Sequence, residues 1–150
     1  MRIAIVGQGY VGTALAAAAM AVGDEVVGID LDEVKIEQLH ENFKNKNYKV
    51  TQDFEKVNSC EVVVIAVPTP LDADRKPDTQ ALKSALSSMK TYLSEGTLVI
   101  NESTSYPGTL RNLVAAKLGD EFLFAAAPER VDPGNSNWNI RNTPRVISGL

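Results

Sequence analysis

The chain has 150 residues, of which 44% are hydrophobic and 23% charged, and its formal net charge is −4. This length and composition indicate about one globular domain, and interspersed acidic and basic residues leave no basic stripe for nucleic-acid binding. The single cysteine, Cys60, excludes a disulfide within the chain and indicates a reducing, cytoplasmic environment. The single histidine, His40, lies in a helical-looking run, so neither a metal site nor a Ser-His-Asp triad is expected.

Strand-forming and helix-forming stretches alternate along the chain. Strands are predicted at residues 2–7, 25–30, 44–50, 61–67, 97–103, 121–129 and 144–150. Helical segments are predicted at residues 10–23, 31–39, 52–59, 77–96 and 109–119, and a Pro/Gly/Asn-rich loop at 130–143. Such alternation is typical of βαβ units, whose neighbouring strands are parallel and whose crossovers are right-handed.

Several local signals support these boundaries. In residues 61–67 (EVVVIAV), Glu61 is followed by six consecutive apolar residues, as expected of a strand covered on both faces. Gly23 is a plausible helix C-cap, Asp30 or Asp32 a plausible N-cap, and Pro77 falls in the first turn of its predicted helix. The sequence therefore predicts a doubly wound α/β domain, a parallel sheet with helices on both faces.

The segment 3–23 has a second interpretation, because no charged residue lies between Arg2 and Asp24. Arg2 and the later ALAAAAMA run are compatible with a signal peptide. Against this, Gly7, Gly9 and Gly12 would each cost about 1 kcal/mol relative to Ala inside a helix. We therefore expect a strand, a turn and a helix here, and neither export nor membrane association.

The three glycines follow the G-x-G-x-x-G pattern between a strand and a helix, which is typical of Rossmann-like dinucleotide sites. Gly7 allows the turn, Gly9 lets the backbone approach a pyrophosphate, and Gly12 lets the helix pack closely on the sheet. Asp30, 18 residues past Gly12, ends the second strand and can accept both ribose hydroxyls. It also repels a 2′-phosphate by ~1 kcal/mol in water and ~4 kcal/mol at an effective dielectric near 20, so NAD is preferred over NADP. Two alternatives remain, namely Asp32 as the ribose ligand and a glycine turn that binds nothing.

Three further motifs follow predicted strands, where open α/β sheets bind ligands. They are VPTP (67–70), ESTSYPGT (102–109) and APERVDPGN (127–135), and GQGYVG (7–12) makes a set of four. In this order the four motifs resemble the N-terminal domain of the nucleotide-sugar 6-dehydrogenases, the UDP-glucose and UDP-N-acetylhexosamine dehydrogenase family. The resemblance implies NAD-dependent oxidation of C6 of a UDP-sugar from alcohol to carboxylate. It also implies a homo-oligomeric full-length enzyme of polysaccharide biosynthesis.

The resemblance also implies roles for individual residues. Thr69 would contact the dinucleotide beside its phosphates, and Lys35 would reach the ribose. Thr104 and Glu129 are the catalytic candidates, the first near the nicotinamide and the reacting hydroxyl, the second handling protons or water. The full set of expected cofactor-binding residues is Gly7, Gln8, Gly9, Tyr10, Val11, Gly12, Asp30, Lys35, Val67, Pro68, Thr69, Thr104 and Glu129.

Structural explanations compete with these roles. Thr69 lies between two prolines and is compatible with a plain loop. Ser103 and Thr104 are compatible with capping the next helix. Glu129 and Arg130 are compatible with an exposed ion pair of little energetic weight.

The chain departs from the family pattern in two respects. The segment between its second and fourth strands is short and lacks a Pro-Ile-Glu loop that relatives carry. The family's nucleophilic cysteine, its partner lysine and asparagine and most of the UDP-sugar site belong to a later domain, and Cys60 precedes its strand on the wrong side to replace that cysteine. We therefore expect residues 1–150 to form an NAD-binding domain that is inactive alone.

The sugar and the function class stay open to alternatives. PER followed by DPGN resembles the N-acetylhexosamine branch more than the UDP-glucose branch. A dehydrogenase of small hydroxyacids and a stand-alone NAD-binding module without catalysis are the two competing functions.

Overall fold

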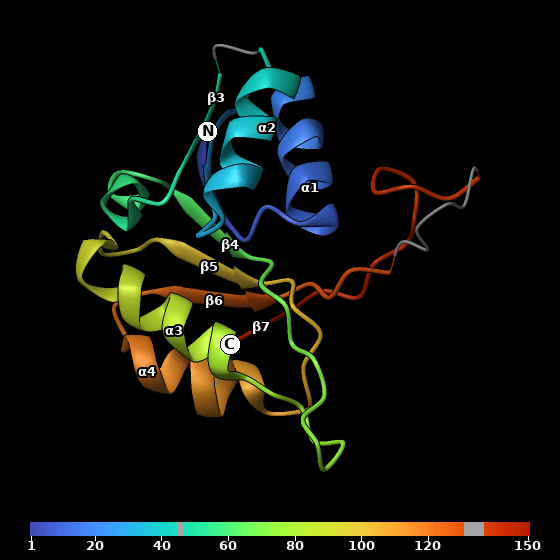
Figure 1. Ribbon diagram of the computed structural model, residues 1–150. Helices are drawn as coiled ribbons and strands as arrows, with labels where there is room; N and C mark the ends of the chain where they lie inside the picture. Colours follow the sequence, from blue (N-terminus) through green and yellow to red (C-terminus); the bar gives the residue numbers. More distant parts are fainter. Residues whose placement is uncertain (45–46, 131–136) are drawn as a thin grey trace.

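A computed structural model describes residues 1–44, 47–130 and 137–150 (Figure 1). Its strands form one seven-stranded sheet in the order β3-β2-β1-β4-β5-β6-β7. The strands are β1 (Arg2–Val6), β2 (Glu25–Ile29), β3 (Tyr48–Thr51), β4 (Val62–Ile65), β5 (Leu98–Asn101), β6 (Leu123–Ala126) and β7 (Ser148–Gly149). The helices are α1 (Tyr10–Ala21), α2 (Glu33–Asn42), α3 (Gln80–Met89) and α4 (Ala116–Leu118), with short helical segments η1 (Phe54–Val57), η2 (Lys90–Tyr92) and η3 (Leu110–Ala115).

Helices cover both faces of the sheet, α1 and α2 on one and α3 and α4 on the other (Figure 1). Alternate residues of the central strands supply the two cores, because successive side chains of a strand point to opposite faces. Ile5 and Val26 pack in the core under α1 and α2. Ala4 and Val27 pack in the core under α3 and α4. The predicted doubly wound α/β fold is therefore confirmed.

The strand register aligns the ends that form the site. Val6 of β1 is paired with Ile29 of β2 and with Ile65 of β4. Ile65 is paired in turn with Asn101 of β5. The chain runs outward from β1 to β3 and then returns to β4 on the other side of β1. The sheet therefore has its topological switch point between β1 and β4, where open α/β sheets bind ligands.

The N-terminal segment is a strand, a turn and a helix rather than one apolar helix. β1 pairs with a parallel strand on each side. Gly23 follows α1 with a φ of +93°, and its amide donates to the carbonyl of Met20. Asp32 is the N-cap of α2 and accepts from the amide of Lys35 at 3.2 Å. Within the described residues, no helix has the length and apolar character that crossing a membrane would require.

Two predicted helices differ in the structure. The helix predicted from Pro77 begins at Gln80 with Thr79 as N-cap, because Pro77 instead pairs with Leu71 in an isolated antiparallel bridge that closes a loop. The helix predicted at 109–119 opens with six residues in the wider π-helical form, Leu110–Ala115, before α4 continues it.

The last strand also differs from its prediction. β7 is two residues long rather than spanning 144–150, and it runs antiparallel to β6. A parallel neighbour requires a crossover connection, usually a helix, whereas an antiparallel one does not. The described residues between β6 and β7 contain no such helix, so the chain folds back beside β6.

Candidate functional site

A cavity of about 730 Å³ lies at the carboxyl ends of β1, β2, β4 and β5, within the ~300–1,000 Å³ range of ligand pockets. Eleven of the thirteen predicted cofactor-binding residues line it, and the two that do not are Gln8 and Gly12. Asp30 and Lys35 lie on the β2 side of the switch point, and Glu102, Thr104 and Glu129 lie past the ends of β5 and β6.

The three glycines of the turn meet different surroundings. A Cβ on Gly7, whose φ is +93°, would lie 2.5 Å from the carbonyl oxygen of Ala66. A Cβ on Gly12 would lie 1.9 Å from the carbonyl oxygen of Gly7, so α1 could not pack so closely on the turn. A Cβ on Gly9 would meet no heavy atom within 4 Å. Packing therefore requires glycine at positions 7 and 12, whereas Gly9 faces open space at the cavity.

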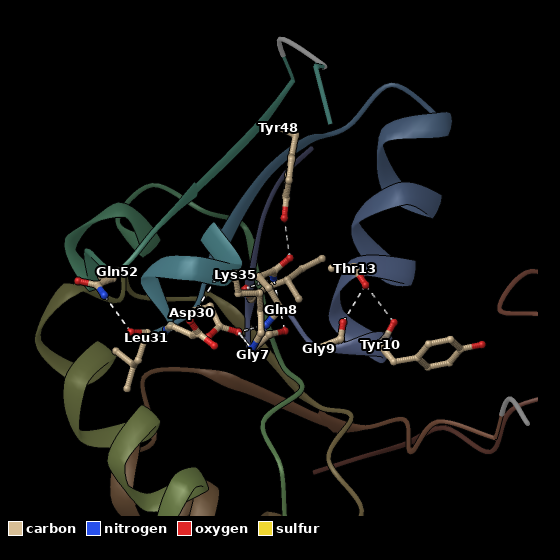
Figure 2. Close-up of polar contacts among 12 residues, drawn as sticks. Gly7, Gln8, Gly9, Tyr10, Thr13, Asp30, Leu31, Lys35, Tyr48 and Gln52 are labelled. Atoms are coloured by element: carbon tan, nitrogen blue, oxygen red, sulfur yellow. Dashed lines mark hydrogen bonds and ion pairs between the residues drawn. The ribbon is translucent and has the colours of Figure 1, made fainter. Parts of the chain in front are cut away.

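The N-terminus of α1 opens on this cavity. Gly9 is its N-cap, no side chain caps it, and its first turn holds no acidic residue. The hydroxyl of Thr13 donates back to the carbonyl of Gly9 at 2.8 Å (Figure 2). Uncapped amides and the positive end of the helix dipole make such a terminus a binding site for phosphate groups.

Asp30 is held as a carboxylate at the end of β2 (Figure 2). Its oxygens accept from the amides of Gln8 at 2.8 Å and Asp32 at 3.1 Å, and from Lys35 Nζ at 3.0 Å. Burial raises the pKa of Asp30, but these three hydrogen bonds outweigh burial and leave the pKa below its ordinary value. Asp32 does not line the cavity and caps α2, so the structure favours Asp30 over Asp32 as the acid that meets a ligand.

Gln8 supports the turn from beneath rather than lining the cavity. Its side chain is 2% exposed, and its Nε2 donates to the carbonyl of Ile5 at 2.7 Å. The hydroxyl of Tyr48 on β3 donates to Gln8 Oε1 at 2.8 Å (Figure 2). Gly28 makes room for this pair, since a Cβ there would lie 2.8 Å from Gln8 Cδ and 3.0 Å from the Tyr48 oxygen. Burial raises the pKa of Tyr48 to about 12, which keeps its phenol protonated as the donor.

The loops after β4 and β5 are tied together. The hydroxyl of Ser103 donates to the carbonyl of Val67 at 2.8 Å, and that of Thr69 donates to the carbonyl of Thr104 at 2.6 Å. The alternative that Ser103 or Thr104 caps the next helix is wrong, because that helix begins at Leu110 with no side-chain cap. Thr69 is likewise more than a plain loop residue, because its side chain fixes the position of Thr104.

A cluster that the sequence analysis missed lies behind this rim. Arg145 Nη1 donates to Glu102 Oε1 at 2.6 Å, and Arg145 Nη2 donates to Glu129 Oε2. The alternative of an exposed Glu129–Arg130 ion pair is wrong, because Glu129 pairs with Arg145 and its side chain is 10% exposed. Burial raises the pKa of Glu102 and outweighs the effect of Arg145, which lowers it. Glu102 was visible within its motif, whereas no local signal marks Arg145.

Cys60 and His40 lie apart from the cavity. Cys60 is buried just before β4, at the opposite end of the strand, and burial raises the pKa of its thiol. His40 is exposed on α2. In the described part of the chain, no group of three or more His, Cys, Asp or Glu residues is placed to hold a metal ion. The VDPGNS stretch at 131–136, which includes the predicted DPGN turn, lies outside the described residues.

The chemistry of the lining fits a dinucleotide. Uncapped amides of α1 suit a pyrophosphate, the Asp30 carboxylate suits the two hydroxyls of a ribose, and the open side of Gly9 leaves room for close approach. Glu102 adds a buried oxygen, Oε2, that has no hydrogen-bond partner among the described residues.

Comparison with known proteins agrees with this assignment. A family model described as the NAD binding domain of the UDP-glucose/GDP-mannose dehydrogenase family matches residues 1–43 and 37–150. Protein CapL of Staphylococcus aureus is 31% identical over 99% of this chain and 39% of its own length. UDP-N-acetyl-D-glucosamine 6-dehydrogenase of Salmonella typhi is 31% identical over 99% of this chain and 40% of its own length. The solved structure of UDP-D-ManNAc dehydrogenase from Pyrococcus horikoshii superposes with a TM-score of 0.86, at 31% identity, over 99% of this chain and 41% of that one.

These matches also bear on length. The chain spans about 40% of the length of the curated relatives it matches. The two matched pieces of the family model meet at residues 37–43, the C-terminal part of α2. The alignments with CapL and the Salmonella enzyme run over 169 residues, more than the 150 of this chain. The overlap of the two matched pieces falls in the segment between the second and fourth strands, which was predicted to be short.

Proposed function

Because the chain belongs to the UDP-glucose/GDP-mannose dehydrogenase family as its NAD-binding domain, we propose that it is the cofactor half of a UDP-N-acetylhexosamine 6-dehydrogenase. The observation that carries the proposal is the cavity at the switch point, which joins the uncapped start of α1 to the Asp30 carboxylate. The family match covers the whole chain, so the alternative of a small-hydroxyacid dehydrogenase is set aside. The named relatives support an N-acetylated sugar as the substrate.

Different residues along the cavity bind different parts of the dinucleotide. The amides of Gly9, Tyr10 and Val11 at the start of α1 hold the pyrophosphate. Asp30 binds the adenosine ribose, and hydrogen bonds from the amides of Gln8 and Asp32 and from Lys35 keep its carboxylate ionised and fixed. Val67, Pro68 and Thr69 form the wall beside the phosphates.

The opposite side of the cavity is the reacting end. A nicotinamide held there would supply the hydride acceptor for oxidation at C6 of the sugar. Thr104, placed by its carbonyl contact with Thr69, hydrogen-bonds near the reacting hydroxyl. Glu129, held by Arg145, is positioned to accept or donate a proton during oxidation.

The sugar itself is handled outside residues 1–150. The curated relatives are more than twice as long as this chain. The resemblance to the family implies that its nucleophilic cysteine belongs to the later part. We infer that these 150 residues bind NAD but do not oxidise a UDP-sugar. Purified chain mixed with NAD and UDP-N-acetylglucosamine should form no NADH, and measurable formation of the uronate would contradict the division into two domains.

Calorimetric titration with NAD and NADP tests the cofactor assignment. NAD should bind at least about fivefold more tightly, since a 2′-phosphate near the Asp30 carboxylate costs ~1 kcal/mol or more. Asp30→Asn should narrow this ratio, while Asp120→Asn, an equal charge change on an exposed loop residue, should leave it unchanged. The assignment fails if NAD does not bind, or if Asp30→Asn leaves the ratio at its original value.

A further inference from the structure

Two buried carboxyl groups share one arginine behind the rim of the cavity. The side chains of Glu102, Glu129 and Arg145 are 5%, 10% and 16% exposed. Arg145 reaches each carboxylate with a different guanidinium nitrogen. With all three groups ionised, the cluster carries one net negative charge that no charge within it balances.

One carboxylate oxygen of the cluster, Glu102 Oε2, lacks a hydrogen-bond donor among the described residues. Glu102 lines the cavity, and this oxygen is buried. A buried acceptor without a donor costs free energy, and more so when it belongs to a charged group. Its surroundings therefore favour a ligand that brings positive charge to this end of the cavity.

The strand register places the cluster at the nicotinamide end. Asp30 and Glu102 each directly follow a strand end, and those ends are aligned through β1 and β4. Three strand spacings of ~4.8 Å separate β2 from β5, about 14 Å in all. A dinucleotide lies across this crevice, so a molecule with its adenosine at Asp30 brings its other half toward Glu102.

We propose that the Glu102–Arg145–Glu129 cluster makes this domain bind oxidised NAD more tightly than reduced NADH. The oxidised nicotinamide ring carries a positive charge, whereas the reduced ring is neutral. Asp30 and Lys35 lie at the other end of the cavity, where the oxidised and reduced cofactors present the same adenosine. The inference rests on the proposed NAD binding and adds a preference for one redox state of the cofactor.

The expected preference is about tenfold. Opposite unit charges about 10 Å apart at an effective dielectric near 20 interact strongly enough for a factor of this size. Removing the net negative charge of the cluster should abolish most of the preference for NAD over NADH. The isosteric variants Glu102→Gln and Glu129→Gln each leave one neutral ion pair with Arg145, so the two should act alike.

The test is calorimetric titration of the 150-residue chain with NAD and with NADH, in low salt and at about pH 8, well above the ordinary carboxyl range. The measured quantity is the ratio of the two dissociation constants. Glu102→Gln should lower the ratio of the NADH to the NAD constant about tenfold. Glu95→Gln, an equal charge change at an exposed residue outside the cavity, should leave it unchanged. Arg145→Lys should keep most of the ratio, because it keeps the cluster charge.

The outcomes separate this inference from the proposed function. If neither cofactor binds to the wild-type chain, both fail. If both cofactors bind and Glu102→Gln leaves the ratio unchanged, the inference alone fails. If thermal melting shows that Glu102→Gln does not fold, the same ratio of dissociation constants is measured with Glu129→Gln, and an unchanged ratio there refutes the inference.

Discussion

Gly9 and Gly12 lie three residues apart in one motif, yet their replacement by alanine should have separate consequences. At Gly12 the new Cβ would lie 1.9 Å from the carbonyl oxygen of Gly7 and 3.4 Å from the side chain of Ile5. At Gly9 it would meet nothing within 4 Å, and the φ of −77° there suits alanine. Gly12→Ala should therefore lower stability, and Gly9→Ala should lower affinity for NAD.

The magnitudes follow from packing and helix propensity. Overpacking typically costs 1–3 kcal/mol, and a clash with a rigid backbone carbonyl belongs near the upper end. Alanine in a helix interior recovers about 1 kcal/mol relative to glycine. Gly12→Ala should thus lower the free energy of unfolding by about 2 kcal/mol, or Tm by about 4–8 °C for a domain of this size.

For Gly9→Ala the stability effects nearly cancel. Alanine is a poorer N-cap than glycine, but it reduces the conformational entropy of the unfolded chain by about 0.4–1 kcal/mol. The free energy of unfolding should stay within about 1 kcal/mol of the wild type. The Cβ would intrude where the backbone approaches the pyrophosphate, so NAD affinity should fall at least about tenfold.

Urea denaturation and calorimetric titration of both variants check this pair of predictions. The reasoning is refuted if Gly12→Ala is as stable as the wild type, because the helix would then not need its close approach to the turn. It is also refuted if Gly9→Ala binds NAD with unchanged affinity, because the open side of Gly9 would then not face the ligand.

Three further outcomes are expected. Tyr48→Phe should lower the free energy of unfolding by about 1–2 kcal/mol, because it leaves Gln8 Oε1 buried without its donor, and Tyr92→Phe, at a half-exposed ring, should have almost no effect in the same urea titration. The folded-state pKa of Asp30 lies below its ordinary value of 3.8, so its stabilising contribution is present above pH 3.8 and is lost as the pH falls through the folded value. The stability difference between wild type and Asp30→Asn should therefore shrink on acidification, and a constant difference would contradict the hydrogen-bond scheme. Cys60 should react slowly with iodoacetamide in the native chain and rapidly in urea, since burial raises the pKa of its thiol, and fast native alkylation would show that the thiol is accessible.

Much of the fold is encoded in short stretches of sequence. The apolar run at 62–67 contains β4, whose core residues Val63 and Ile65 are fully buried. The glycine pattern located the turn before α1 because Gly7 is constrained by the backbone just past the adjacent strand β4, and Gly12 by the carbonyl of Gly7. Asp30 was identified for a similar reason, since its place at the end of β2 follows from the strand itself.

The features that the sequence analysis missed depend on distant partners. Arg145 lies 43 residues from Glu102, and Tyr48 lies 40 residues from Gln8. Nothing near either residue marks its partner, because each pairing exists only once segments far apart in sequence are brought together by the folded sheet. The prediction that α3 begins at Pro77 was wrong for a related reason, because Pro77 pairs with Leu71 in a β-bridge instead of joining the helix.

The Gln8, Gly28 and Tyr48 cluster makes the phosphate-facing turn depend on an edge strand. A larger side chain at position 28 would collide with Gln8 and Tyr48. Loss of the Tyr48 hydroxyl would leave Gln8 Oε1 without its hydrogen-bond donor. Changes at these three positions should therefore be strongly epistatic, with double-mutant cycles departing from additivity. A lineage that alters one of the three would have to alter the others with it, so the identity of the residue at position 8 is set by a strand on the far side of β2.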